Sequence, residues 1–241
     1  MKLILEIKCK SFPIASQMLG VSIIKHALSR QSNEYMESMY KYTDGRSNKN
    51  TKNFCFAIRA FDYEINGDEF DIKNKVVMVI SSPDQEFIIR TYNGLVSNRE
   101  IKYKHYDLKI QKIYAKMHSP IKREAAVFKT ISPIFIKGKD KREIAVDDPN
   151  FIEELNYISE KVLVNYRGYG LFEKLEFQPI DMKKKVVKLD IKGFEDKNRI
   201  LSVDAYEGIF KLKGNSQDLT ELNQLGLGFR RGQGFGAIEL L

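Results

Sequence analysis

The order of strands and helices expected along the chain predicts an α+β protein made of two ferredoxin-like (RRM-like) domains in tandem. Each would be an antiparallel sheet with helices on one face. The series strand, helix, two strands, helix, strand occurs twice in the 241 residues. Halves of about 120 residues are long enough to bury a core without a metal ion or a disulfide. We therefore expect domains at 1–118 and 119–241, with one extra strand in the second.

The elements of the first half follow from alternation, helical periodicity and a capping sequence. Residues 2–9 alternate apolar and charged side chains, which is typical of a half-buried strand. A helix over 13–30 continues as a second piece to Tyr40, and a polar, basic loop covers 44–52. Ser82–Gln85 reads as a capping box with proline at the first helical position, and opens a helix to about residue 96. The remaining strands are expected at 53–64, 75–81, 99–104 and 107–117.

The second half repeats the order of elements without repeating residues. A strand is expected at 125–131, and Asp148-Pro149 opens a helix with its apolar side chains on one face. Gly168 and Gly170 end that helical region. Three strands follow, at 173–181, 184–192 and 199–213. The chain then continues as a short helix over 217–225, a glycine-rich loop over 226–236 and a final strand over 235–240.

Charge and cysteine usage narrow the class of protein. The formal net charge is +8, which favours a polyanionic partner such as nucleic acid. The alternative is a cytoplasmic protein that has a high isoelectric point without such a partner. Cys9 and Cys55 lie in separate strand-like runs with no metal-ligand spacing, so buried thiols in a reduced, cytoplasmic setting are expected, with no metal site and no cofactor. No apolar run approaches the roughly 18 residues that cross a bilayer, so no membrane partner is expected.

The loop Gly226–Gly236 is the most informative segment. It has five glycines in eleven positions, with Arg230 and Arg231 in the middle as candidate phosphate ligands. It follows a helix and opens a strand, which is the reverse of a dinucleotide-binding loop, and it lacks the Gly-Lys-Ser/Thr of a Walker loop. A loop that only packs against the other half is the alternative.

A glycine-rich loop of this form, directly before the last strand, resembles the signature of the CRISPR-associated endoribonucleases that process precursor CRISPR RNA, in the superfamily of repeat-associated RNA-binding proteins. The resemblance covers essentially the whole chain, including Thr130–Ile134, Gly168–Phe177 and the helical segment after Pro13. It implies metal-independent cleavage within the CRISPR repeat. Attack by the ribose 2′-oxygen would leave a 2′,3′-cyclic phosphate and a 5′-hydroxyl and yield mature guide RNA.

That reaction needs a base, a cation and an acid, and three residues are candidates. His26 lies off the apolar stripe of its helix, with Ser22 one turn before and Arg30 one turn after, so it is the candidate base; a solvated surface histidine is the alternative. Tyr40 stands where some relatives carry histidine, and is a candidate for orienting the phosphate or acting as acid. Lys52 stands where relatives carry the phosphate-stabilising lysine.

Other residues are expected to bind the RNA backbone. The candidates are Arg230, Arg231, Gly228, Gly232, Gly234, Lys25 and Arg30. A basic stretch around the first strand of the second half, Lys137–Arg142 above all, is a further candidate surface, with a solvated face as the alternative. His105 lies in a turn of basic and aromatic residues, for which RNA contact and simple solvent exposure are both open. His118 is expected in the linker between the two halves.

Three functions remain open at this point. The leading hypothesis is the repeat-specific endoribonuclease. Its expected partners are repeat RNA and other subunits of a CRISPR complex, and its expected oligomeric state is a monomer or a homodimer. The second is a non-catalytic RNA-binding subunit of a CRISPR interference complex. The third, a small-molecule enzyme on the same fold, is disfavoured because paired carboxylates, metal-ligand spacing and nucleotide motifs are missing from the sequence.

Overall fold

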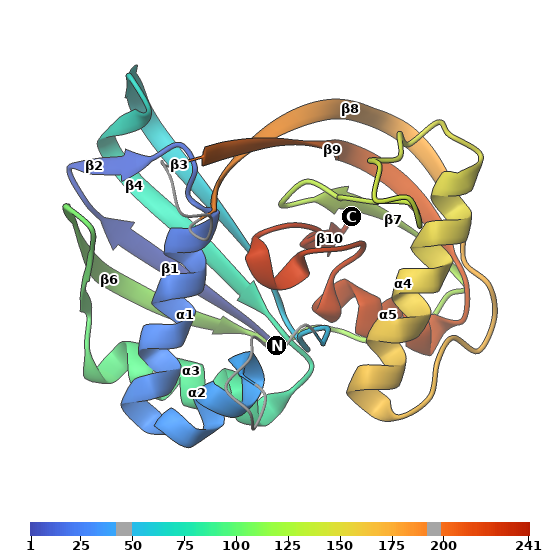
Figure 1. Cartoon of the computed structure of the whole chain (residues 1–241). Helices are drawn as coiled ribbons and strands as arrows, with labels where there is room; N and C mark the ends of the chain where they lie inside the picture. Colours follow the sequence, from blue (N-terminus) through green and yellow to red (C-terminus); the bar gives the residue numbers. More distant parts are fainter. Residues whose placement is uncertain (42–49, 192–198) are drawn as a thin grey trace.

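The computed structural model describes residues 1–41, 50–191 and 199–241, and places two antiparallel sheets side by side (Figure 1). The strands of the first sheet are β1 (Lys2–Lys8), β2 (Ser11–Pro13), β3 (Cys55–Asn66), β4 (Glu69–Ser81), β5 (Glu100–Tyr103) and β6 (Tyr106–Lys116). Those of the second are β7 (Ala125–Thr130), β8 (Glu176–Ile191), β9 (Arg199–Lys213) and β10 (Ile238–Leu240). Most of the polar loop expected at 44–52 lies outside the described residues.

Both sheets have the same connectivity, which confirms the tandem ferredoxin-like fold. In the first, β4 lies between β3 and β1, and β1 lies between β4 and β6. In the second, the order is β10-β7-β9-β8. The helices are α1 (Gln17–Gln31), α2 (Asn33–Tyr40), α3 (Gln85–Ser97), α4 (Asn150–Arg167) and α5 (Ser216–Leu225), with a short 3-10 helix, η1 (Arg231–Gln233). None of the helices in the described part of the chain has the length and apolar content of a membrane-spanning segment.

Local sequence explains several helix ends. Gly168 adopts a positive φ of 87° and ends α4, as predicted. At α3 the predicted capping box is wrong in detail. Asp84 is the N-cap, because its side chain accepts a hydrogen bond from the Phe87 amide at 3.1 Å, while Ser82 Oγ accepts one from the Asp84 amide at 3.0 Å. The helix therefore begins at Gln85, two residues after Pro83.

The extra strand expected in the second half is wrong. A single strand, β8, replaces the two predicted ones, and it pairs with β9 along its whole length. The register shifts between Pro179 and Asp181, as in a β-bulge, and this irregularity interrupts the alternation that a sequence pattern follows. In the first half, β4 begins at Glu69, earlier than predicted, because it forms a hairpin with the exposed end of β3.

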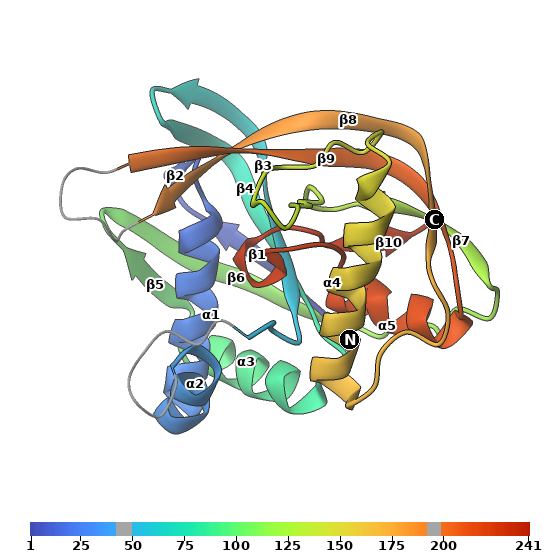
Figure 2. The same cartoon turned by 45° about the vertical axis from the view of Figure 1, so that its right-hand side comes forward.

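The two halves are tied together by buried contacts beyond their separate cores. Cys55 and Ala57 of β3 pack with Ala237, which directly precedes β10. Lys2 Nζ donates a hydrogen bond to the carbonyl of Ile238 at 3.1 Å. The long β8–β9 hairpin also reaches over the first half (Figure 2), where Lys188 Nζ lies 3.5 Å from a carboxylate oxygen of Asp68. The chain crosses between the sheets after Lys116, and the division at 118/119 remains a proposal.

Candidate functional site

The glycine-rich loop Gly226–Gly236 lies against the first half of the protein. Gly226 has a φ of +81°, and a Cβ added there would be 2.9 Å from Cys55 Cβ, so only glycine fits this approach to β3. The predicted RNA-binding glycines are also in close contact with protein. Gly228 meets Phe135, Gly232 meets the Lys52 side chain, and Gly234 meets Phe56. The contacts of Gly226, Gly232 and Gly234 join the halves, whereas that of Gly228 lies within the second half, and together they set the position of the loop's two arginines.

The two arginines have different environments. The half-buried Arg230 guanidinium lies over the Phe135 ring, 5.4 Å from its centroid. Arg231 is only 4% exposed, and its guanidinium donates to the carbonyls of Leu225 (2.5 Å) and Lys52 (2.9 Å). The expectation that Arg231 contacts RNA phosphates does not fit this burial, and we correct it to a structural role. A buried cation needs its hydrogen-bond partners inside the protein.

Three of the predicted site residues meet where the last residue of α2 lies against the middle of α1 and the segment before β3. We call Lys25, Tyr40 and Lys52 the lysine–tyrosine cluster. The Lys25 ammonium lies 4.3 Å from the centroid of the Tyr40 ring, and the Lys52 ammonium 5.5 Å. Lys52 Nζ also donates to the carbonyl of Met39. The arrangement gathers positive charge around an aromatic ring, which suits a phosphodiester better than a neutral ligand.

Burial changes the ionisation of this cluster. The pKa of Lys52 is lowered, first by desolvation and then by the charge of Lys25, and the pKa of Lys25 by desolvation and the charge of Lys41. Burial raises the pKa of Tyr40, whose hydroxyl has no hydrogen-bond partner among the described residues. An anion placed here would relieve the repulsion between the lysines and could accept a hydrogen bond from the phenol.

His26 points about 100° away from Lys25 around the axis of α1 and faces the end of α3. Its Nε2 lies 3.0 Å from Asn98 Nδ2. Asn98 Oδ1 accepts from the Glu100 amide at 3.1 Å, so the amide nitrogen is the group that faces the ring, and the Nε2 lone pair accepts its proton. Desolvation and the charge of Arg30, which is exposed near the end of α1, lower the pKa of His26, so the imidazole is neutral at pH 7.

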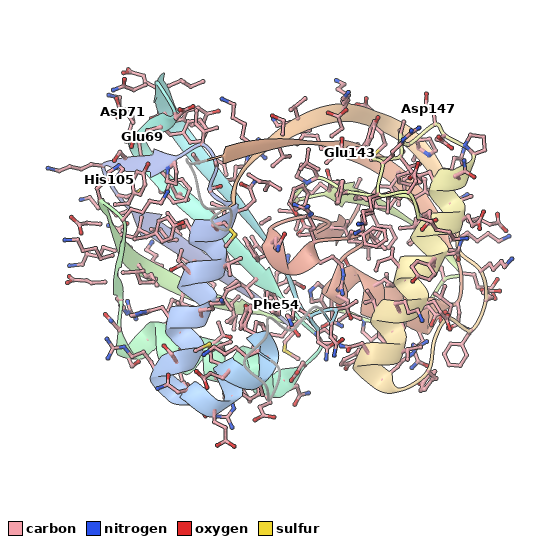
Figure 3. All side chains as sticks on the ribbon, in the orientation of Figure 1. Phe54, Glu69, Asp71, His105, Glu143 and Asp147 are labelled. Carbon is pink, nitrogen blue, oxygen red and sulfur yellow. The ribbon has the colours of Figure 1, made fainter. Side chains whose placement is uncertain are left out.

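The other histidines lie elsewhere. His105 Nε2 is 2.7 Å from Glu69 Oε1, and Figure 3 shows this pair far from Phe54, which marks the junction of the halves near Lys52. His118 Nδ1 is 3.3 Å from Asn223, and burial lowers the pKa of His118 to about 4. Each of the chain's three histidines is thus engaged away from the lysine–tyrosine cluster.

A groove of about 790 Å³ runs between the two sheets. Its walls come from β3, from β8 and β9, and from the segment 130–133. Its cationic and aromatic lining residues are Phe56, Arg59, Phe61, Tyr63, Phe70, Lys129, Lys185 and Lys188, and Asp62 and Glu207 line it as well. Gly234 lines this groove and Gly232 packs on Lys52, so the glycine-rich loop links the groove to the lysine–tyrosine cluster. The strand cations were missed in the sequence, because single basic residues on strands have no local signature.

The basic stretch Lys137–Arg142 is partly paired with acids, as are the groove residues Lys129, Lys185 and Lys188. Lys139 Nζ lies 4.0 Å from Glu153 and Arg142 Nε 3.4 Å from Asp140. Glu143 and Asp147 lie near this stretch in the upper part of the second half (Figure 3). Ion pairing does not separate the two surfaces, and the groove is the better candidate for RNA because its cations come from both halves and the glycine-rich loop links it to the lysine–tyrosine cluster.

Comparison with known proteins decides the family. Residues 114–240, more than half of the chain, match the family model described as CRISPR associated protein Cas6, C-terminal. The chain belongs to the Cas6 family. This confirms the resemblance inferred from the glycine-rich loop. Within the family, CRISPR-associated endoribonuclease Cas6 1 from Methanocaldococcus jannaschii is 24% identical, in an alignment that covers 99% of this chain and 92% of that protein.

Solved structures agree on the Cas6 fold. The product of a Cas6-related gene from Pyrococcus furiosus superposes with a TM-score of 0.83 at 17% identity, over 100% of this chain and 98% of that one. An RAMP protein that binds different RNA substrates superposes with a TM-score of 0.81 at 15% identity, over 100% and 99%. At these identities, the structural likeness shows the fold that Cas6 proteins share and no more.

Proposed function

We propose that this chain is an endoribonuclease that cleaves the CRISPR repeat of precursor transcripts and so produces mature guide RNA. The observation that carries the proposal is the lysine–tyrosine cluster, in which two ammonium groups gather over Tyr40 beside the glycine-rich loop of a Cas6-family protein. The name of the relative from Methanocaldococcus jannaschii, an endoribonuclease, supports the same activity.

The proposed chemistry is metal-independent transesterification. The ribose 2′-oxygen attacks the adjacent phosphorus as the bond to the 5′-oxygen breaks, and a 2′,3′-cyclic phosphate and a 5′-hydroxyl result. The 2′-hydroxyl proton passes to a base, for which His26 is our candidate, and the leaving oxygen gains a proton. Lys52 stabilises the negative charge of the phosphorane, and the Tyr40 phenol donates a hydrogen bond to it. Lys25 holds the neighbouring phosphate.

The groove supplies the path of the RNA strand. Its volume of about 790 Å³ and its cations from both halves suit a single strand held by its phosphates, with Phe61 and Tyr63 available for stacking. Phe61 and Tyr63 are 40% and 43% exposed, with Arg59 over the Phe61 ring and Phe70 against the Tyr63 ring, so stacking on a base would use the part of each ring that these contacts leave open. A strand leaving the groove past Gly234 would reach the lysine–tyrosine cluster.

A cleavage assay in excess EDTA tests the reaction. The purified protein should cut its cognate repeat RNA under these conditions and leave a cyclic phosphate on the upstream fragment. An RNA with deoxyribose at the cut site should bind with unchanged affinity and stay intact, because the attacking oxygen is missing. Cleavage of that deoxy-substituted RNA, or 5′-phosphate ends on the product, would contradict the proposal.

Lys52→Ala tests the role of the cluster. Losing a cation that stabilises transition-state charge should lower the single-turnover rate by about 10²–10³-fold. Lys8→Ala, at an exposed position of β1, is the matched control and should cut at the normal rate. Equal rates for the two variants would remove Lys52 from the mechanism.

A second function, RNA binding without cleavage, is favoured by one observation. The Nε2 atom of His26 is engaged by Asn98, so the candidate base is turned away from Lys52. The structural similarity to an RAMP protein that binds different RNA substrates is compatible with this role. Tight, salt-sensitive binding of repeat RNA with no scission over hours would select this function over the first.

A further inference from the structure

We infer that Asn165 and Arg231, both from the second half, are positioning residues that hold Lys52 at the scissile phosphate. The inference rests on the proposed function. Lys52 lies just before β3 in the first half, but its backbone neighbourhood is fixed by α4 and by the glycine-rich loop. The site would then be assembled across the junction of the two halves.

Arg231 fixes the backbone at Lys52 itself. One guanidinium nitrogen donates to the Lys52 carbonyl at 2.9 Å and another to the Leu225 carbonyl at 2.5 Å. Leu225 ends α5, where free carbonyls and the helix dipole attract a cation. Burying a guanidinium is costly, so it persists where its hydrogen bonds are well formed. Arg231 thus clamps the end of α5 to the residue that carries the ammonium group.

Asn165 fixes the residues on both sides of Lys52. From α4, its Nδ2 donates to the Thr51 carbonyl at 3.2 Å and to Asn53 Oδ1 at 2.7 Å. The side chain of Lys52 is confined as well, because a Cβ on Gly232 would stand 3.1 Å from Lys52 Cγ. A cavity of about 190 Å³ lies beside this segment, between α2 and the start of α3, and Lys52 and Asn165 are among its lining residues. The backbone and the stem of the lysine are both held from the second half.

This anchoring matters because lysine is a flexible side chain. Ordering it costs up to about 2 kcal/mol in rotamer entropy, and a displacement of about 1 Å at a reacting centre can cost about 10²-fold in rate. A fixed backbone and a confined stem reduce the volume that the ammonium group explores. The contacts from α4 and η1 are therefore expected to act on the rate of cleavage and to leave RNA affinity nearly unchanged.

Asn165→Ala is the first test, because Asn165 is exposed and its loss should not unfold the protein. The single-turnover cleavage rate should fall about 10-fold, while the Kd for repeat RNA changes by less than about two-fold. Lys161→Ala, one turn earlier on the same face of α4, is the matched control and should behave as the wild type. A wild-type rate for Asn165→Ala, with Lys52→Ala impaired, would overturn this inference alone.

A double-mutant cycle separates positioning from a merely structural role. If Asn165 acts through Lys52, adding Asn165→Ala to Lys52→Ala should not lower the rate further. An additional 10-fold loss in the double variant would show that Asn165 acts elsewhere and would contradict the inference. A wild-type rate for Lys52→Ala would overturn the proposed role of Lys52, and the positioning role with it.

Arg231 is tested by its conservative replacement. Arg231→Met keeps the apolar stem but removes both donors, whereas Arg231→Lys keeps one donor. The cleavage rate should rise in the order Met, Lys, Arg, with RNA affinity nearly constant. If circular dichroism shows that both variants are folded, and both cleave RNA at the wild-type rate, then Arg231 does not position Lys52. If Arg231→Met is unfolded, the comparison of Arg231→Lys with wild type decides the point.

Discussion

At the residue scale, the hydroxyl of Tyr40 is buried and has no hydrogen-bond partner in the described part of the chain. A buried hydroxyl without a hydrogen-bond partner lowers stability, and a partner from outside the described residues would offset that cost. Two lysine ammonium groups lie over the ring that carries it. A phosphate drawn to the lysines would reach this phenol only if the residues that cover the hydroxyl moved aside. Under the proposed function, the hydroxyl finds its partner in the substrate.

Tyr40→Phe should therefore separate stability from activity. The ring stays in place for Lys25 and Lys52, so Tm should be unchanged or slightly raised, while the single-turnover rate falls by about 10²-fold or more. Differential scanning fluorimetry and gel-based cleavage assays measure the two effects. Tyr40→Leu, which also loses the aromatic face, should additionally weaken RNA binding. A Tyr40→Phe variant that is unstable yet fully active would contradict this assignment.

The proposed role of His26 predicts a pH profile. Its pKa lies below the usual 6.5, so the neutral form that accepts a proton is lost only as the pH falls below 6.5. The cleavage rate should thus be flat at neutral pH and fall on the acid side with a midpoint below 6.5. His26→Ala should lower the rate by about 10²-fold and abolish that limb. An unchanged rate would remove His26 from the mechanism.

Sequence reasoning treated Arg230 and Arg231 as equivalent, and the structure separates them. Both are arginines in the middle of one glycine-rich loop, and nothing local distinguishes them. The difference arises because Arg230 takes a left-handed conformation with a φ of 56°, after which η1 turns the next side chain inward. Burial at this position depends on the end of α5 and on Lys52, which is 179 residues away in sequence. A sequence pattern does not contain that information.

At the scale of elements, the glycine-rich loop is a joint between the halves as well as a candidate RNA contact. Both readings were open from the sequence, and the close approach of Gly226 to Cys55 supports the packing role directly. The strand alternation of β1 and the ends of α4 were predictable because their determinants are local. The bulge in β8 and the early start of β4 depend on pairing partners and were not.

Gly226→Ala should destabilise the protein because the new Cβ would be strained by the positive φ and would crowd Cys55. A loss of about 1–3 kcal/mol in the free energy of unfolding is expected from urea titration. Gly67→Ala is the matched control, since Gly67 also has a positive φ (+61°) but has open space around its Cα. The Gly67→Ala variant should lose only about 1 kcal/mol in the free energy of unfolding. Equal losses would mean that the contact with β3 carries no strain.

At the scale of the whole molecule, the groove between the sheets predicts salt-sensitive RNA binding. Each phosphate contact on a single strand contributes about 0.7 to the slope of log K against log salt concentration. Arg59→Ala should reduce the magnitude of this slope by about that amount, measured by fluorescence anisotropy. Lys109→Ala is the control, because Lys109 is paired with Glu100 at 3.4 Å away from the groove. A slope unchanged by Arg59→Ala would place the RNA elsewhere.

The junction between the halves also predicts a dependence of stability on pH. His118 is buried there next to Asn223, and desolvation lowers its pKa from 6.5 to about 4. The unfolded chain binds the proton more readily, so this stability is fully present above pH 6.5 and is lost as the pH falls towards 4. In urea titrations at pH 7 and pH 5, His118→Gln should lose less stability on acidification than the wild type. An identical loss would contradict the assignment.

The hydrogen bond from Arg231 to Lys52 spans 179 residues of sequence. During synthesis on the ribosome, a nascent chain therefore presents Lys52 long before the residue that steadies it has been translated. An incomplete or prematurely terminated polypeptide would lack the ordered lysine even if its first sheet had already folded. Under the proposed function, the chain becomes able to cleave RNA only late in translation. Truncated products would be inactive and would not damage cellular transcripts.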